Sequence, residues 1–113
     1  MTELTPVQIA GAAEEGDELA WELILNSARC LGAATVSVMN VINPEMVLIG
    51  GAMTFGRDAS EVGGQFIERV REEVRGRAFQ IPAERTAIRF AELGADAGFI
   101  GAAGYVKLRL RGA

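Results

Sequence analysis

Two short segments of this chain have the character of β-strands, and they constrain the fold most. Met46–Ile49 is a run of apolar residues bounded by Pro44 and Gly50, which predicts a buried strand of a parallel sheet. Thr86–Ala91 alternates enough between apolar and polar side chains to predict a second strand. Because a helical pattern separates them, the two strands form one right-handed β-α-β unit. Two strands make a poor sheet alone, so we expect the chain to be the edge of a larger α/β sheet or to complete itself by dimerising.

Helical patterns fill the sequence before the first strand. Thr5 is placed as an N-cap with Gln8 in the capping-box position, and Gly16 marks the end of that short helix. Asp17 caps a second, long helix that ends before Pro44. Its later half is expected to be covered on most sides, with the lone Cys30 as a core filler. The predicted buried stripe is Ala20, Ile24, Ala28, Leu31, Thr35, Val38 and Ile42.

Two further helices complete the order α-α-β-α-β-α. Small residues such as Gly32 allow a neighbouring element to approach the long helix closely. The helix between the strands has an apolar face of Val62, Phe66, Ile67, Val70 and Val74. Asp96 is expected to cap a last helix from Ala97 to about Arg111. In that helix Gly98, Gly101 and Gly104 form a small-residue stripe suited to close packing.

The composition excludes several kinds of chemistry. The 113 residues contain no His and one Cys, so there is no Ser-His-Asp or Cys-His catalytic set and no His or multi-Cys metal site. No paired carboxylates are spaced for acid/base work, because Glu14-Glu15 and Glu72-Glu73 point to different helix faces. The sequence therefore predicts no catalytic residue and no metal ligand.

The charges are unevenly distributed. Residues 1–61 carry nine acids and two bases, whereas residues 62–113 carry six acids and nine bases. The arginines between positions 69 and 77 alternate with glutamates, which is typical of a solvated helix face, and no aromatic residues are spaced among them to stack on bases. We expect no nucleic-acid binding by this segment. With no signal sequence and no apolar stretch of about 20 residues, we also expect no membrane association and a cytoplasmic location.

The glycine pair after the first strand is the main candidate for a ligand site. Gly50 and Gly51 follow Ile49 directly, at the edge of an α/β sheet where ligands bind. Glycines there let a ligand approach the backbone, although a tight turn also requires them. The segment Gly51–Gly56 has the glycine spacing of a P-loop, but Arg57-Asp58 stands where Lys-Ser/Thr is required. The residues alone leave a ligand loop and a plain turn equally open.

Taken together, these motifs resemble a known family. Asn43–Gly51 (NPEMVLIGG) and Leu93–Ala103 (LGADAGFIGAA) are similar to the C-terminal portion of the ROK family (repressor, open reading frame, kinase), which includes bacterial glucokinases. Gly16–Ala20 and the segment from Leu31-Gly32 to Asn40 match in the same order. The resemblance extends from about Thr5 to Val106.

The resemblance implies a fold and a ligand. The fold is α/β, part of an actin/hexokinase-like (ribonuclease-H-type) domain with a short parallel sheet and with ATP bound in the cleft between two lobes. Carried over to this chain, it places Gly50, Gly51 and Ala52 at the nucleotide, where Ala52 replaces a frequent third glycine of the family. Asp96 matches the family's Leu-Gly-x-Asp-Ala-Gly segment and is kept as a helix cap.

Other family motifs are missing from these 113 residues. They are the Asp-x-Gly-x-Thr phosphate loop, the Asn-Asp pair of the catalytic base, the sugar-binding Glu and His, and the His/Cys zinc motif. Residues 1–113 are therefore expected to be a single C-terminal, nucleotide-side segment that lacks the N-terminal lobe. In the parent kinase, ATP with Mg²⁺ and a hexose are the expected ligands. The segment alone is expected to be non-catalytic, to bind no cofactor tightly and to form a homo-oligomer, most simply a dimer.

Two alternatives remain open. The same segment also suits a sugar-responsive transcriptional repressor of the family, in which a DNA-binding module would precede the sugar domain. A third possibility is a non-catalytic oligomerising module without a ligand, in which the apolar helices form the interface.

Overall fold

The computed structural model describes residues 3–51, 54–78 and 84–112. Its elements confirm the predicted α/β order and strand positions. They are α1 (Pro6–Glu14), α2 (Glu18–Ile42), β1 (Met46–Ile49), the 3₁₀ turn η1 (Arg57–Ala59), α3 (Glu61–Arg77), β2 (Ala87–Phe90), the 3₁₀ turn η2 (Gly94–Asp96) and α5 (Ala97–Arg111).

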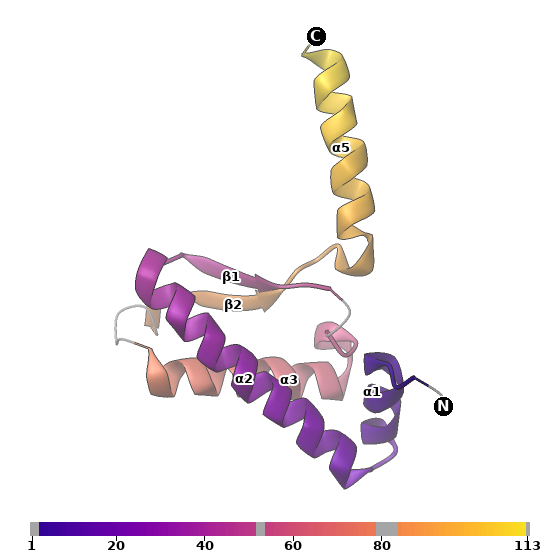
Figure 1. Cartoon of the computed structure of the whole chain (residues 1–113), viewed down its shortest axis with the longest axis vertical. Helices are drawn as coiled ribbons and strands as arrows, with labels where there is room; N and C mark the ends of the chain where they lie inside the picture. Colours follow the sequence, from indigo (N-terminus) through magenta and orange to yellow (C-terminus); the bar gives the residue numbers. More distant parts are fainter. Residues whose placement is uncertain (1–2, 52–53, 79–83, 113) are drawn as a thin grey trace.

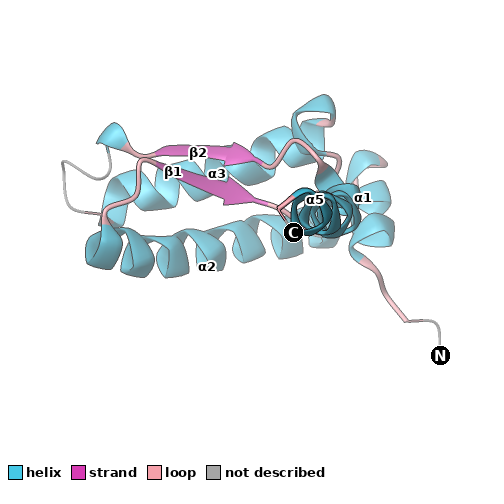
Figure 2. Ribbon diagram, turned by 90° about the horizontal axis from the view of Figure 1, so that it is seen from above, coloured by secondary structure: helices cyan, strands magenta, loops and turns pink. Residues whose placement is uncertain are grey.

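The two strands form a parallel sheet that is covered on one face. Met46 pairs with Ala87 and Ile49 with Phe90 along the register. Helices α2 and α3 both lie on the same side of this sheet (Figure 1), and the view from above shows α3 behind the strands and α2 alongside β1 (Figure 2). The uncovered face leaves Leu48 59% exposed. The prediction that Met46–Ile49 is a buried strand is therefore right in position and wrong in burial, because helices cover only one face.

Packing between α2 and α3 forms the core. The predicted apolar face of α3 is confirmed, since all five of its members are buried: Val62, Phe66, Ile67, Val70 and Val74. Ile24, Ala28 and Met39 of α2 are buried in the same cluster. Ile88 and Phe90 of β2 join it from the sheet.

The buried stripe of α2 differs from the predicted one in its second half. Thr35 is buried as predicted, whereas Leu31, Val38 and Ile42 are exposed. Gly32, Val36 and Met39 are buried in their place. A Cβ built at Gly32 would lie 2.7 Å from Glu73 Cβ, so α3 approaches the backbone of α2 closely at this glycine. The prediction was based on apolar side chains, and Gly32 has none. The predicted stripe was therefore placed partly on the wrong face of this half of α2. The expectation that this half is covered on most sides is wrong for the described residues.

Cys30 also lies outside the buried stripe. It is exposed, which corrects its prediction as a core filler. Two positions along a helix correspond to a rotation of about 200°, so Cys30 points away from the face on which Ala28 is buried.

The helix ends in the first half of the chain are capped as the sequence predicts. The hydroxyl of Thr5 accepts from the Gln8 amide at 3.3 Å, while Gln8 Oε1 accepts from the Thr5 amide at 3.0 Å. Asp17 Oδ1 accepts from the Ala20 amide at 2.9 Å. Gly16, with φ of +95°, provides the left-handed residue after α1. These local signals are confirmed because they depend on neighbours in sequence alone.

Helix α5 stands away from the rest of the molecule (Figure 1). Every residue from Ala97 to Arg111 is exposed, including Phe99 at 78% and Leu110 at 76%. A Cβ built at Gly98, Gly101 or Gly104 would meet nothing within 4 Å among the described residues. The predicted close packing of this glycine stripe is therefore not made within the described chain.

Among residues 3–51, 54–78 and 84–112, no helix is long and apolar enough to cross a membrane.

The tight approach at Gly32 predicts a cost for a side chain there. Gly32→Ala should lower the free energy of unfolding by about 1–3 kcal/mol, because the new methyl group would press on Glu73 and on the Val70 carbonyl. Denaturant unfolding followed by circular dichroism measures this.

Gly64→Ala is the matched control in α3. A Cβ at Gly64 meets nothing within 4 Å, so this variant should be more stable than the original chain by about 0.5–1 kcal/mol. If Gly32→Ala were as stable as Gly64→Ala, the close approach of the two helices would be wrong.

Candidate functional site

The turns that follow β1 and β2 lie side by side at one edge of the sheet. Parallel strands bring their carboxyl ends to the same edge, where ligands bind in open α/β sheets. The Ala91 amide donates to the Ile49 carbonyl at 2.8 Å, which continues the pairing beyond the strand. A Cβ built at Gly50 would lie 3.6 Å from Ala91 Cβ. The predicted glycine turn is thus in contact with the end of β2.

The backbone of the glycine turn is accessible. Gly50 and Gly51 are both exposed, and Gly51 has φ of +86°, a conformation that L side chains rarely adopt. A Cβ at Gly51 would meet nothing within 4 Å, so space remains open above this backbone. Ala52, the third predicted nucleotide contact, lies outside the described residues.

A strained turn brings the chain back to the sheet edge. Phe55, Gly56 and Arg57 have φ of +49°, +85° and +55°, three consecutive left-handed residues. For a residue with a side chain this conformation costs about 1–2 kcal/mol, so the surroundings must hold it. The buried Phe55 ring packs edge-on against Phe66 with centroids 4.9 Å apart. Gly63, in the first turn of α3, has no room for a Cβ because the Arg57 carbonyl occupies that space.

Arg57 connects this turn to the end of β2. Its Nη1 donates to the Glu92 carbonyl at 2.5 Å and to the Ala91 carbonyl at 3.4 Å. A Cβ built at Gly94 would lie 3.7 Å from Arg57 Cζ. Beside the guanidinium is a cavity of about 260 Å³, lined by Arg57, Asp58, Ala59, Phe90, Ala91 and Glu92. Sequence reasoning used Arg57 only to reject a P-loop and missed this contact, because residues 34 and 35 positions apart carry no local signal of it.

Asp96 lies at the predicted N-cap of α5 but does not act as a side-chain cap. Its carboxylate makes no capping hydrogen bond, and its backbone is helical, with φ of −84° and ψ of −4°. A capping residue normally has extended backbone, which directs its side chain to the first free amides. The 3₁₀ turn η2 runs directly into α5 and leaves Asp96 in the wrong conformation for this role.

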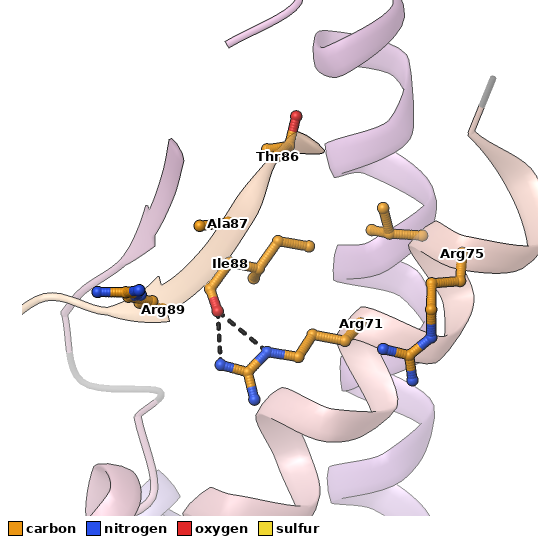
Figure 3. Close-up of a pocket in the computed structure, with 7 residues that line it drawn as sticks. Arg71, Arg75, Thr86, Ala87, Ile88 and Arg89 are labelled. Carbon is orange, nitrogen blue, oxygen red and sulfur yellow. Dashed lines mark hydrogen bonds between the residues drawn. The ribbon is translucent and has the colours of Figure 1, made fainter. Parts of the chain in front are cut away.

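A second cavity, of about 280 Å³, lies at the outer edge of β2 (Figure 3). Arg71 Nε and Nη2 donate to the Ile88 carbonyl at 3.0 and 2.7 Å. The Ala87 and Ala91 amides donate to the carbonyls of Glu45 and Ile49. Because alternate residues of a parallel strand bond to the same neighbour, the Ile88 carbonyl faces away from β1. Arg71 therefore satisfies an acceptor that a further strand would otherwise use. Arg89 lies on the other side of the strand from Arg71 and Arg75 (Figure 3).

Two of the three arginines that line this cavity, Arg71 and Arg75, are already compensated by a carboxylate. Glu68 lies 2.8 Å from Arg75 and 3.4 Å from Arg71. The hydrogen bond from Arg75, together with that from Arg71 and both charges, lowers the pKa of Glu68 against a smaller opposing effect of burial. At this cavity Arg71 thus caps the free edge of β2. The carboxyl edge of the sheet, with Gly50 and Gly51, is the better candidate site. Among the described residues no group of three or more His, Cys, Asp or Glu side chains is placed to hold a metal ion.

Comparison with known proteins identifies the family. The model of the ROK family matches residues 1–109 of the chain. The chain belongs to the ROK family. Its relatives include both sugar kinases and regulators of transcription, and the resemblance based on the NPEMVLIGG and LGADAGFIGAA motifs is confirmed.

Curated relatives of this ROK chain differ in function. It is 36% identical over 77 residues to the xylose repressor of Caldicellulosiruptor bescii, covering 68% of this chain and 18% of the repressor. It is 31% identical over 104 residues to the glucokinase of Halalkalibacterium halodurans, covering 92% of this chain and 30% of the glucokinase. The chain thus spans less than a third of the length of these relatives.

Solved structures confirm the fold class. A protein assigned as a sugar kinase from Cytophaga hutchinsonii aligns with a TM-score of 0.76 and 25% identity, over 95% of this chain and 34% of that one. A ROK family transcriptional regulator, a homologue of the Escherichia coli MLC protein, aligns with a TM-score of 0.62 and 27% identity, over 81% of this chain and 22% of that one. The ROK chain carries part of an actin/hexokinase-like α/β fold.

The lowered pKa of Glu68 predicts a pH-dependent contribution to stability. A carboxyl group whose pKa falls below its ordinary value of 4.5 on folding stabilises the folded chain above that pH. The contribution disappears as the pH falls through the lowered pKa. Because the side chain is half exposed, Glu68→Gln should cost less than about 1 kcal/mol at neutral pH.

Thermal unfolding of both chains between pH 7 and pH 3 measures this effect. The difference in melting temperature should shrink to nothing at the acid end. Glu72→Gln is the control, since Glu72 lies 3.9 Å from Arg69 and should give a smaller difference. A difference for Glu68→Gln that persisted unchanged at low pH would contradict the role of its charge.

Proposed function

We propose that this chain supplies the nucleotide-binding side of an ATP-dependent, glucokinase-like sugar kinase that transfers a phosphoryl group to a hexose. The observation that carries the proposal is the exposed Gly50–Gly51 backbone at the carboxyl edge of the sheet, beside the end of β2. The 31% identity to a glucokinase over 92% of the chain supports it.

The residues at this edge fit a nucleotide in steric terms. Exposed glycines without a Cβ allow a ligand to approach the backbone closely, and the space above Gly51 is open. Gly50 and Gly51 would border the adenosine part of ATP, and Ala52 is proposed beside them. Bound ATP with Mg²⁺ would supply the transferable phosphoryl group and neutralise its charge. The part of this chain in the reaction is to bind and orient the nucleotide.

The residues of the chain do not make a complete kinase. Phosphoryl transfer requires a residue that orients or deprotonates the attacking hydroxyl, together with groups that hold the phosphates and Mg²⁺. The sequence contains no recognisable base of this kind and no phosphate loop. We therefore propose that the chain binds ATP weakly and does not phosphorylate sugars without the rest of a kinase.

A second candidate is the effector domain of a sugar-responsive repressor. The 36% identity to a xylose repressor and the structural similarity to a ROK transcriptional regulator favour it. In that case Gly50 and Gly51 serve as a turn only, and the chain should not bind ATP.

An activity and binding measurement separates these proposals. Purified chain incubated with glucose and ATP should form no glucose 6-phosphate, while equilibrium dialysis should detect ATP binding in the millimolar range. Turnover that survives removal of contaminating kinases would contradict the first expectation. A complete lack of ATP binding would favour the repressor.

We further propose that isolated copies of the chain associate, most simply as a dimer. Apolar side chains on the unpartnered α5 and on the open face of β1 support this, among them Phe99, Leu108, Leu110 and Leu48, all more than half exposed. A second copy would remove this surface from water.

Sedimentation velocity at micromolar concentration tests the association. The expected species is a dimer or larger. A variant with Phe99, Leu108 and Leu110 replaced by Ser should shift toward monomer. A clean monomer for the original chain, without binding of a dye that detects exposed apolar surface, would contradict the proposal.

A further inference from the structure

We propose that Arg57 is a positioning residue, which fixes the Gly50–Gly51 turn in place for the nucleotide. The inference rests on the proposed function, since it concerns the same edge of the sheet. Arg57 does this by holding the segment after β2 against which Gly50 lies.

Gly50 and Arg57 contact the same segment after β2. At the first anchor, the Ile49 carbonyl accepts from the Ala91 amide at 2.8 Å and Gly50 lies against Ala91. At the second anchor, Arg57 Nη1 donates to the carbonyls of Ala91 and Glu92. Both anchors meet at Ala91, so the positions of Gly50 and of Arg57 are fixed relative to the same residue. Removing the guanidinium would release only the second anchor.

Backbone strain shows that the turn at Phe55–Arg57 is held by its surroundings. Arg57 adopts φ of +55° directly after Phe55 and Gly56, which are also left-handed. An unconstrained residue with a side chain avoids this region. The contact of the Phe55 ring with Phe66 holds the start of this turn, and the Arg57 contacts hold its end.

The guanidinium acts on the Gly50–Gly51 turn through protein carbonyls. Nη1 is engaged with two acceptors, and the Gly94 backbone lies beside Cζ. On the side that faces the end of β2, the Arg57 guanidinium is therefore occupied by contacts within the protein. If Arg57 acts by positioning the Gly50–Gly51 turn, its loss should weaken the affinity for adenosine and for ATP by the same factor. If Arg57 instead binds phosphate directly, its loss should weaken the affinity for ATP alone.

Two substitutions separate positioning from folding. Arg57→Gly removes the guanidinium but also relieves the left-handed strain, so the two effects on stability oppose one another. Arg57→Lys keeps the charge and the strain, and a lysine can still donate to one carbonyl, but it lacks the planar fork. Asn43→Gly is the matched control, because Asn43 is left-handed too (φ of +46°) and lies at the end of α2, away from the Gly50–Gly51 turn.

Titrations of the full 113-residue chain with adenosine and with ATP, followed by ¹H–¹⁵N NMR spectra, test the proposal. Both ligands should shift the Gly50 and Gly51 amide signals of the original chain. Arg57→Gly should weaken both ligands by the same factor, about three- to tenfold, because the turn must then be ordered on binding. Its melting temperature should stay close to that of the original chain. The affinities of Arg57→Lys should lie between those of the original chain and those of Arg57→Gly. Asn43→Gly should bind both ligands as the original chain does.

The possible failures are distinguishable. If the original chain shows no shift with either ligand, the proposed nucleotide function fails, and the inference fails with it. If the original chain binds both ligands and Arg57→Gly binds them equally well, only the positioning role is overturned. A loss confined to ATP would also overturn it, since Arg57 would then contact phosphate directly. Should Arg57→Gly not fold, unchanged adenosine affinity in Arg57→Lys would overturn the proposal.

Discussion

The packing of α3 against α2 is the interaction on which the rest of the structure depends. Gly32 lets the two helices approach closely, and the buried face of α3 carries the sheet through contacts with Ile88 and Phe90. The same helix also shapes the candidate site at its first turn. Gly63 leaves room for the Arg57 carbonyl and Phe66 receives the Phe55 ring, so the strained turn packs directly on α3. Core packing and site geometry are therefore parts of one arrangement.

The core covers only one face of the sheet, and this explains the character of the remaining surface. Leu48 on the open face and the whole of α5 keep apolar side chains in water. At the other edge of the sheet, Arg71 satisfies the outward-facing Ile88 carbonyl, as a neighbouring strand would do. The chain spans less than a third of the length of its curated relatives, which are kinases and repressors. The uncovered face of β1 and the surface of α5 are the parts of the described chain that a second copy or further parts of a longer protein could cover.

Local signals could be predicted from the sequence, and contacts between distant segments could not. The caps at Thr5 and Asp17 and the apolar face of α3 were predictable because they depend on spacing within a single helix. In the second half of α2, Leu31, Val38 and Ile42 were predicted wrongly and Thr35 correctly, because α3 packs closely against a glycine there. In the candidate site, the position of Gly50 and Gly51 was predictable from strand order. The contact of Arg57 with Glu92 depends on a left-handed turn and on strand pairing, neither of which leaves a pattern in the sequence.

We propose that the carboxyl edge of the β1–β2 sheet, rather than the arginine-lined cavity, is the ligand site. Photolabelling the chain with 8-azido-ATP, followed by mass spectrometry of its peptides, distinguishes the two places. We expect labelling of the segments around Gly50–Gly51 and Ala91–Gly94, and competition by unmodified ATP. Labelling confined to the segments that contain Arg71, Arg75 and Thr86, which line the other cavity, would contradict it.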